Sequence, residues 1–367
     1  MEEKMMNNSI SISKSQLFFF LVQSQLGIGL LSLPNTVQSS AKGDGWISVL
    51  LAGVFVQFIL LIYWLLLKRF PNEMYTDITK KILGRFLGKL CNAIIYLYFI
   101  LTGSLALVLF IKVINLWLLP LTPSWILSLL IIVSCIYLTL NDLRIIARFF
   151  VLASFLIFLL VFLSFLTFSL SKDFTFILPI GNSGVKNILQ GSDKSLISML
   201  GFEGLLLIFP FIMNKGKGVF KTISVANIFI TILYTYFVFL CLISFNPVQL
   251  QMIREPSIYL FRSLSYTMID RVDLIFLSIW IVPMTTSVIA YLFLAAKSFG
   301  KKKFYKRNVI ISGIIIWSLS LVPLNEKMMN LFSKYVSYLS YFIVIGLPVI
   351  LLCLSIVFKK TESSERA

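Results

Sequence analysis

The sequence has no histidine and few acidic residues. Its 367 residues include 15 Asp and Glu against 32 Lys and Arg, and only 13% of the residues carry a charge. Without histidine the chain cannot build a His-ligated metal site or a His-based catalytic triad. The four cysteines show no Cys-x-x-Cys spacing and all lie in apolar segments, where we expect inert small side chains. We therefore expect no catalytic residue, no metal and no cofactor.

Long hydrophobic runs take the place of the missing charges. The sequence is 59% hydrophobic, and apolar stretches of 18 or more residues recur along it, each long enough to span a bilayer as a helix. In a ten-span arrangement, 22 of the Lys and Arg residues fall on one side of the membrane and 10 on the other. The positive-inside rule then places both termini in the cytoplasm. We expect a multi-pass protein of the cytoplasmic membrane, whose net charge of +17 does not indicate nucleic acid.

The sequence predicts an all-α membrane protein with ten transmembrane helices. The expected spans cover residues 16–40, 46–67, 90–119, 125–140, 145–170, 194–215, 225–245, 272–296, 309–323 and 336–358. We expect a single polytopic domain, 1–367, with cytoplasmic tails at 1–15 and 359–367. The first five spans occupy 16–171, and the last five with their outer loops occupy 172–358. Because five is odd, the two halves would insert in opposite orientations.

Glycines interrupt the first span and the sixth. The first reads Gln-Ser-Gln-Leu-Gly-Ile-Gly-Leu-Leu-Ser-Leu-Pro over 23–34, and the sixth has Gly-Phe-Glu-Gly at 201–204. In hydrocarbon an unpaired backbone group costs several kcal/mol, so a break persists only where something satisfies it. Gly27 and Gly29 alone would also suit close packing of two helices. The second break favours a binding site, since interrupted spans at corresponding positions of two halves indicate a transporter site at the bilayer midplane.

Polar groups at the two breaks suit a small zwitterion. The half-helix after the first break offers free N–H groups, from Gly29 through Leu30 to Leu31, and a positive dipole end to a carboxylate. The side-chain amide of Gln25 lies about one turn earlier. Carbonyls near Gly201, at the end of the half-helix before the second break, suit an ammonium. We expect an amino-acid-like ligand.

Glu203 is the only acidic residue expected in the middle of a span. An ionisable side chain at that depth costs about 2.5 to 3.5 kcal/mol on insertion scales, so a function or a partner is expected. It could hold the broken helix open, bind an amine or carry a proton. Alternatively, its carboxyl group simply accepts the N–H groups that the break frees.

Two uninterrupted spans add further candidates. Ser287 and Tyr291 follow Pro283 at i+4 and i+8, on one face of the eighth span. The serine hydroxyl could equally bond back to its own helix beside the proline. Tyr98 and Thr102 lie in the third span, where the alternative is packing with satisfied hydroxyl groups.

The order of motifs resembles a known family. The segment Gly-Ile-Gly-Leu-Leu-Ser-Leu-Pro at 27–34 is similar to the first-span signature of the amino acid/polyamine/organocation transporter superfamily. Other motifs are Ile-Leu-Gly-Arg-Phe-Leu-Gly at 82–88, Leu-Pro at 178–179, Gly-Phe-Glu-Gly-Leu-Leu at 201–206 and Phe-Pro-Phe at 209–211. With the first, they resemble the B subunit of spore nutrient-germinant receptors over essentially the whole chain.

That resemblance implies a LeuT-type 5+5 inverted repeat with broken helices 1 and 6, in the spore inner membrane of an endospore-forming bacterium. It also implies assembly with receptor A and C subunits and binding of an amino acid or similar nutrient that triggers germination. A stand-alone amino-acid permease is the alternative, and a membrane enzyme is disfavoured because no nucleophile, base and orienting group occur together. The implied site residues are Gly27, Ile28, Gly29, Gly201, Phe202 and Glu203, with Tyr98, Thr102, Ser287 and Tyr291 as further candidates.

Overall fold

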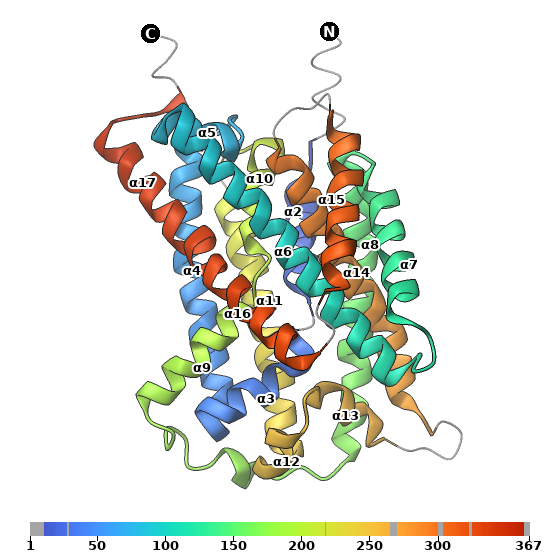
Figure 1. Ribbon diagram of the computed structural model, residues 1–367. Coiled ribbons are helices and arrows are strands. Elements are labelled where there is room, and N and C mark those ends of the chain that lie inside the picture. Colours follow the sequence, from blue (N-terminus) through green and yellow to red (C-terminus); the bar gives the residue numbers. More distant parts are fainter. Residues whose placement is uncertain are drawn as a thin grey trace.

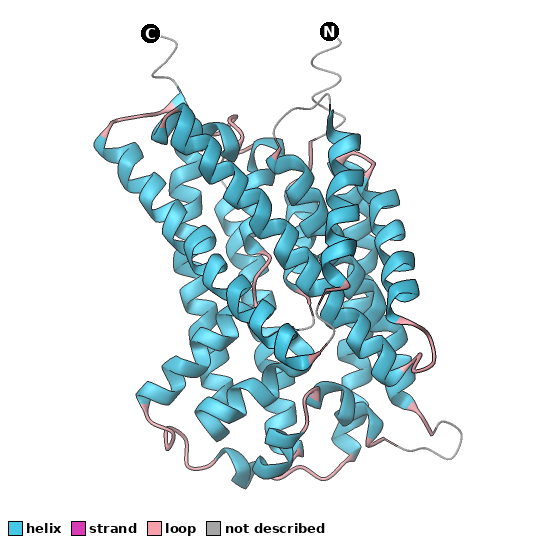
Figure 2. Ribbon diagram, in the orientation of Figure 1, coloured by secondary structure: helices cyan, strands magenta, loops and turns pink. Residues whose placement is uncertain are grey.

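The computed structural model describes residues 11–27, 29–216, 218–264, 270–299, 304–322 and 325–362. Over these ranges the chain is almost entirely helical, and the only β-type pairing is an isolated bridge between Ile12 and Ile212 (Figure 2). A helix satisfies every backbone N–H and C=O within its own segment, as a chain this apolar requires inside a bilayer. The all-α prediction is confirmed.

The described residues up to Phe165 form seven α-helices that run back and forth through the molecule (Figure 1). They are α2 (Lys14–Gln25), α3 (Gly29–Ala41), α4 (Gly45–Arg69), α5 (Tyr75–Leu83), α6 (Arg85–Trp117), α7 (Ser124–Thr139) and α8 (Leu143–Phe165). The first predicted span is therefore divided into α2 and α3, with its break where the sequence places Gly27.

The second part begins with another divided span. Its helices are α9 (Val185–Ser198), α10 (Leu205–Ile208), α11 (Val219–Ser244), α12 (Pro247–Met252), α13 (Pro256–Arg262), α14 (Val272–Ser298), α15 (Tyr305–Ser320), α16 (Glu326–Ser340) and α17 (Leu347–Val357). Short 3-10 turns, Phe202–Gly204 and Phe209–Phe211, flank α10, and a π-helical turn, Tyr341–Gly346, joins α16 to α17.

Two predicted boundaries are wrong by about nine or ten residues. The sixth span starts at Val185, not at residue 194, because charged residues such as Lys186 and Asp193 make α9 look like a loop although its other face is buried. The tenth starts at Glu326, not at residue 336, because the first half of that helix is polar. The buried face of α9 includes Gly191, Ser192 and Ser195, and that of α16 includes Ser340, so neither face stands out as a run of large apolar residues.

Six helices in the described ranges are long and apolar enough to cross a membrane. The bent pair Val185–Ser198 and Phe202–Phe211, which meet at 53°, would make a seventh. Shorter helices such as α7 fall below this criterion, so the number of ten spans stays a prediction. On α8, Leu152, Phe155 and Phe162 are each about 70% exposed, as expected of side chains that face lipid. The chain is a multi-pass membrane protein.

Both ends of the described chain lie on one side of the molecule (Figure 1). The backbone N–H of Ile12 donates to the carbonyl of Phe211 at 2.9 Å. Nearby, Lys215 Nζ donates to the carbonyl of Pro71, and the neighbouring Asn72 amide donates to the Glu362 carboxylate at 2.9 Å. These contacts bring the first and last described residues to the same end of the helical bundle.

Candidate functional site

The first break exposes carbonyl groups that side chains from distant helices satisfy. Helix α2 ends at Gln25 and α3 begins at Gly29; Ile28 lies outside the described residues. From α11, the Tyr234 hydroxyl donates to the carbonyl of Gln25 at 2.8 Å. From α14, the Ser287 hydroxyl donates to the carbonyl of Leu26. The break is thus held open by two hydroxyl groups that the fold brings to it.

The second break is held by a side chain of its own segment. Gly201 has a φ of +127°, and its N–H donates to Glu203 Oε2 at 2.7 Å. The other carboxylate oxygen accepts the Tyr98 hydroxyl at 2.8 Å, and Tyr291 lies against the same carboxylate. Glu203 is fully buried. Its carboxyl group therefore accepts an N–H that the break frees, which is the structural alternative given above.

The two breaks touch each other at their glycines. A Cβ atom on Gly29 would lie 2.7 Å from the carbonyl oxygen of Ser198, and one on Gly201 would lie 2.2 Å from that of Ser24. Both distances are shorter than real contacts allow. The Ser24 hydroxyl also donates to the carbonyl of Gly201 at 3.1 Å. Gly27 differs, because the nearest atom to its Cβ position is Ser287 Oγ at 3.9 Å.

A cavity of about 210 Å³, which we call the break cavity, lies beside the first break. Residues of α2, α3, α6, α14, α16 and the end of α9 line it. Six of the predicted site residues are among them: Gln25, Gly27, Gly29, Thr102, Ser287 and Tyr291. The break cavity is therefore enclosed by both interrupted spans together with the third, eighth and tenth spans.

Five other predicted residues do not line the break cavity. Tyr98, Gly201 and Glu203 form the hydrogen-bonded group behind it. The ring of Phe202 packs 6.1 Å from that of Tyr63. Leu30 is fully buried. The structure therefore divides the predicted set into lining residues and supporting residues.

Gln25 lines this cavity and has a buried acceptor that is shielded from it. Its side chain is buried, and Nε2 donates to the carbonyl of Leu21 at 3.0 Å. Its Oε1 atom has no hydrogen-bond partner in the described part of the chain. A buried carbonyl oxygen without a partner costs about 1–3 kcal/mol, so it favours a ligand that donates a hydrogen bond.

Several residues of this region were not predicted from the sequence. Ser333 and Ser337 of α16 line the break cavity, and their i, i+4 spacing was the available signal. Leu105 and Ala106 form part of its apolar wall. No local pattern marks Tyr234, whose role depends on how α11 packs against α2.

The break cavity is compatible with an amphipathic ligand of a few heavy atoms. Among the described residues no Asp, Glu, Lys or Arg side chain lines it, so its polar contacts come from hydroxyl groups, one amide and the backbone. The start of α3 adds N–H groups that have no partner within the helix, with the positive end of the helix dipole.

Comparison with known structures shows the fold. The crystal structure of MhsT in complex with L-phenylalanine superposes with a TM-score of 0.66 at 15% sequence identity, covering 94% of this chain and 89% of MhsT. MhsT is LeuT-like, so the predicted LeuT-type fold is confirmed.

Comparison of sequences shows the family. The model of the family described as "Spore germination protein" matches residues 11–329. Spore germination protein GerQB of Bacillus cereus is 28% identical over 344 residues, or 92% of this chain and 94% of the relative. Spore germination protein A2 of Bacillus subtilis is 27% identical, covering 87% of this chain and 88% of the relative. The chain therefore belongs to the spore germination protein family.

Proposed function

We propose that this chain is the nutrient-binding subunit of a spore germinant receptor and that an amino acid or similar small nutrient occupies the break cavity. The observation that carries the proposal is the Gln25 Oε1 atom, which has no hydrogen-bond partner among the described residues and lies at the first break near the start of α3. The ligand's carboxylate would face the α3 N-terminus, where N–H groups and the helix dipole favour an anion. Its ammonium would donate to Gln25 Oε1 once that side chain, whose oxygen is shielded in this structure, turns toward the break cavity.

The backbone carbonyls at the breaks would contribute less to ligand binding than the sequence suggested, because side chains already donate to them. Those of Gln25 and Leu26 already accept hydroxyl groups from Tyr234 and Ser287. The apolar part of the ligand would lie against Leu105 and Ala106 of α6. The L-phenylalanine bound to MhsT, a protein of the same fold, supports an amino acid as the ligand class.

Binding becomes a signal only if the ligand has different affinities for two states of the protein. In the proposed receptor, a change in how α2, α3 and α9 pack around the ligand would pass to A and C subunits in the spore inner membrane. The two halves, 16–171 and 172–358, would move relative to each other, with both termini in the cytoplasm. Neither role requires catalysis by this chain.

Equilibrium binding of labelled amino acids to the purified protein tests the site. Gln25→Leu should weaken binding about tenfold or more, because a charge-assisted hydrogen bond of about 1.5–3 kcal/mol is lost. Gln190→Leu is the matched control, since Gln190 is exposed on α9 and does not line the break cavity. Equal affinities of the two variants would contradict the proposal.

A second experiment separates a receptor subunit from a stand-alone permease. Proteoliposomes that contain only this chain would accumulate labelled amino acid if it were a permease. A receptor subunit would bind without accumulation. Exchanging the gene for a paralogue should then move the nutrient preference of germination with it.

A further inference from the structure

The break cavity is walled off from the side of the molecule on which both described chain ends lie, which we call the tail side (Figure 1). Of the half-helices on that side, α2 contributes only its last residues, Ser24 and Gln25, to the described lining, and α10 contributes none. All four residues of α10 are buried, and so are Leu17, Phe20 and Leu21 of α2. A packed layer therefore separates the break cavity from the tail side.

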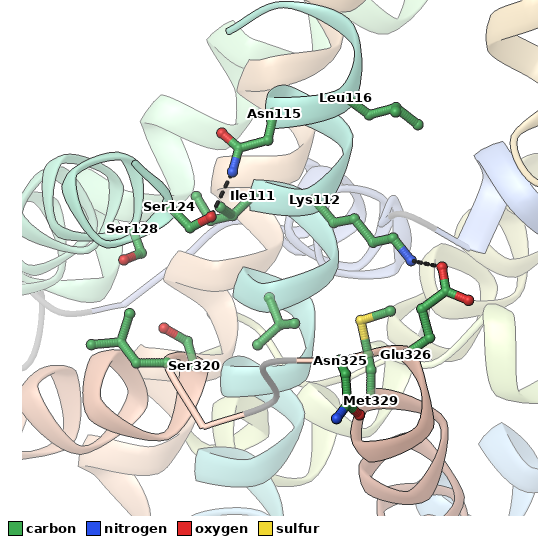
Figure 3. Close-up of a pocket in the computed structure, with 12 residues that line it drawn as sticks. Ile111, Lys112, Asn115, Leu116, Ser124, Ser128, Ser320, Asn325, Glu326 and Met329 are labelled. Atoms are coloured by element: carbon green, nitrogen blue, oxygen red, sulfur yellow. Dashed lines mark hydrogen bonds and ion pairs between the residues drawn. The ribbon is translucent and has the colours of Figure 1, made fainter. Parts of the chain in front are cut away.

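Away from the tail side, a second cavity of about 460 Å³ follows the break cavity along two of its walls (Figure 3). On α6, Leu109 lines the break cavity and Lys112 lines the second one. On α16, Ser333 lines the break cavity and Met329, one turn earlier, lines the second one. The two sides of the break cavity therefore differ, with packed half-helices toward the tails and a further cavity in the opposite direction.

A backbone bridge joins the two tail-side half-helices. Ile12, which comes shortly before α2, is fully buried beside the segment that follows α10. Its N–H donates to the carbonyl of Phe211, and its carbonyl accepts the N–H of Met213, each at 2.9 Å. Because these two bonds fix the start of one broken span to the end of the other, we expect α2 and α10 to move as one unit.

Lys215, two residues after this bridge, reaches from that unit to the loop that follows α4. Its Nζ atom donates to the carbonyl of Pro71 at 2.6 Å and to Asn72 Oδ1 at 2.9 Å. The helix after this loop, α5, is fixed to α6, since Thr79 Oγ1 donates to Asn92 Oδ1 at 2.7 Å. Lys215 therefore ties the unit of α2 and α10 to a separate wall of the molecule.

Residues 359–362, which we call the C-terminal strap, hold the same loop. The Glu362 carboxylate accepts the backbone N–H of Asn72 at 3.0 Å and its Nδ2 at 2.9 Å. Lys360 Nζ donates at 2.7 Å to a carbonyl in the last turn of α5, which anchors the strap. The side chain of Asn72 thus binds Lys215 through its oxygen and Glu362 through its nitrogen.

We propose that Lys215, Asn72 and Glu362 form a latch that keeps the break cavity closed toward the tail side. A path from that side requires the unit of α2 and α10 to part from the loop after α4, and the bonds of Lys215 cross this boundary. The strap stabilises the latch by ordering the loop. Asn72 is exposed, and hydrogen bonds at exposed residues contribute little, so the latch can open without unfolding the helices. This device controls access to the cavity and does not depend on the ligand proposed for it.

Thiol labelling from each side of the membrane tests the latch. Ser333→Cys places a reporter in the break cavity of the full chain, with Cys91 and Cys353 changed to Ser and the buried Cys135 and Cys241 kept. Intact cells and inverted membrane vesicles present the two sides to a membrane-impermeant maleimide. The reporter should react from the side opposite the tails and much more slowly from the tail side.

Two substitutions release the latch. Lys215→Met and Glu362→Ala should each raise the labelling rate from the tail side about three- to tenfold, because one lost hydrogen bond changes the ratio of open to closed forms by about that factor. Lys80→Met and Asp77→Ala are the matched controls, since these two residues form an exposed ion pair on α5, at 2.9 Å, outside the latch. They should leave the rate unchanged.

Labelling from the side opposite the tails shows that each variant has folded. If Lys215→Met does not fold, Asn72→Ala removes the side-chain contacts with both Lys215 and Glu362 at an exposed position. Tail-side labelling that is already as fast in the reporter chain as in the latch variants would overturn the proposal. Latch variants that label no faster than the two controls would overturn it as well.

Discussion

The two helix breaks are satisfied in opposite ways. At the first, the hydroxyl groups of Tyr234 on α11 and Ser287 on α14 donate to carbonyl groups that the unwound chain exposes. At the second, Glu203 accepts the N–H of Gly201 only two residues before it. The first break therefore depends on tertiary packing, whereas the second has a partner within its own segment in addition to the Ser24 hydroxyl that donates to the Gly201 carbonyl.

This difference separates a site from its support. The first break borders the break cavity, and beside it the buried Gln25 Oε1 atom has no partner among the described residues. The second break, with Glu203 fully buried and bonded to Tyr98, lies behind the cavity lining. A ligand at the first break would pair with the Gln25 amide and face the start of α3, while the second break would form a fixed wall.

Substituting one glycine at each break gives the largest expected contrast. Gly201→Ala would place a Cβ 2.2 Å from the carbonyl oxygen of Ser24, at a φ of +127°. Overpacking and the strained backbone should together cost about 3 kcal/mol or more. Gly27→Ala meets its nearest atom at 3.9 Å and should leave the fold intact. Thermal unfolding of the purified variants measures the difference.

The same pair of variants separates folding from binding. Gly27→Ala adds a methyl group beside the break cavity, so amino-acid affinity should fall while thermal stability is kept. Equal thermal stability of Gly27→Ala and Gly201→Ala would contradict the conclusion that the second break is packed more tightly than the first.

Replacing Glu203 should have the next largest effect. Glu203→Ala leaves the Gly201 N–H and the Tyr98 hydroxyl without their acceptor, at about 1–3 kcal/mol for each group. Glu203→Gln keeps an acceptor oxygen and should retain more stability and more nutrient response. Size-exclusion profiles, thermal unfolding and germination assays compare the two. Equal loss in both variants would show that the charge itself is required.

Local signals in the sequence were sufficient to locate the breaks. Glycines that interrupt an apolar run appear in the sequence itself, and both breaks lie where Gly27 and Gly201 indicated. An isolated carboxyl group in a span also stands out. In the structure, Glu203 accepts the N–H of Gly201, as expected if its carboxyl group binds N–H groups that the break frees. These features depend on residues close together in the chain.

The features that the sequence did not reveal depend on contacts between distant segments. Tyr234 is one of many aromatic residues in apolar spans, and only the packing of α11 brings its hydroxyl to the first break. Ser333 lies outside the predicted tenth span, 336–358, because the first half of that helix is polar, and Ser337 lies at the start of that span with no motif that marks it. Polar helices buried by other helices are the hardest elements to find by hydrophobicity alone.

Removing the Tyr234 hydroxyl gives the smallest and most specific test of the comparison. Its oxygen lies 2.8 Å from the carbonyl of Gln25 and 3.2 Å from that of Ser198, so it joins the ends of α2 and α9. Tyr234→Phe keeps the ring and should cost about 1 kcal/mol in stability. Ligand affinity should change more than stability, since the freed Gln25 carbonyl borders the ligand. Thr102→Val is the control, because the Thr102 hydroxyl donates to its own helix at Tyr98. If both variants lower affinity equally, any hydroxyl near the break cavity would matter as much as the one that joins the two breaks.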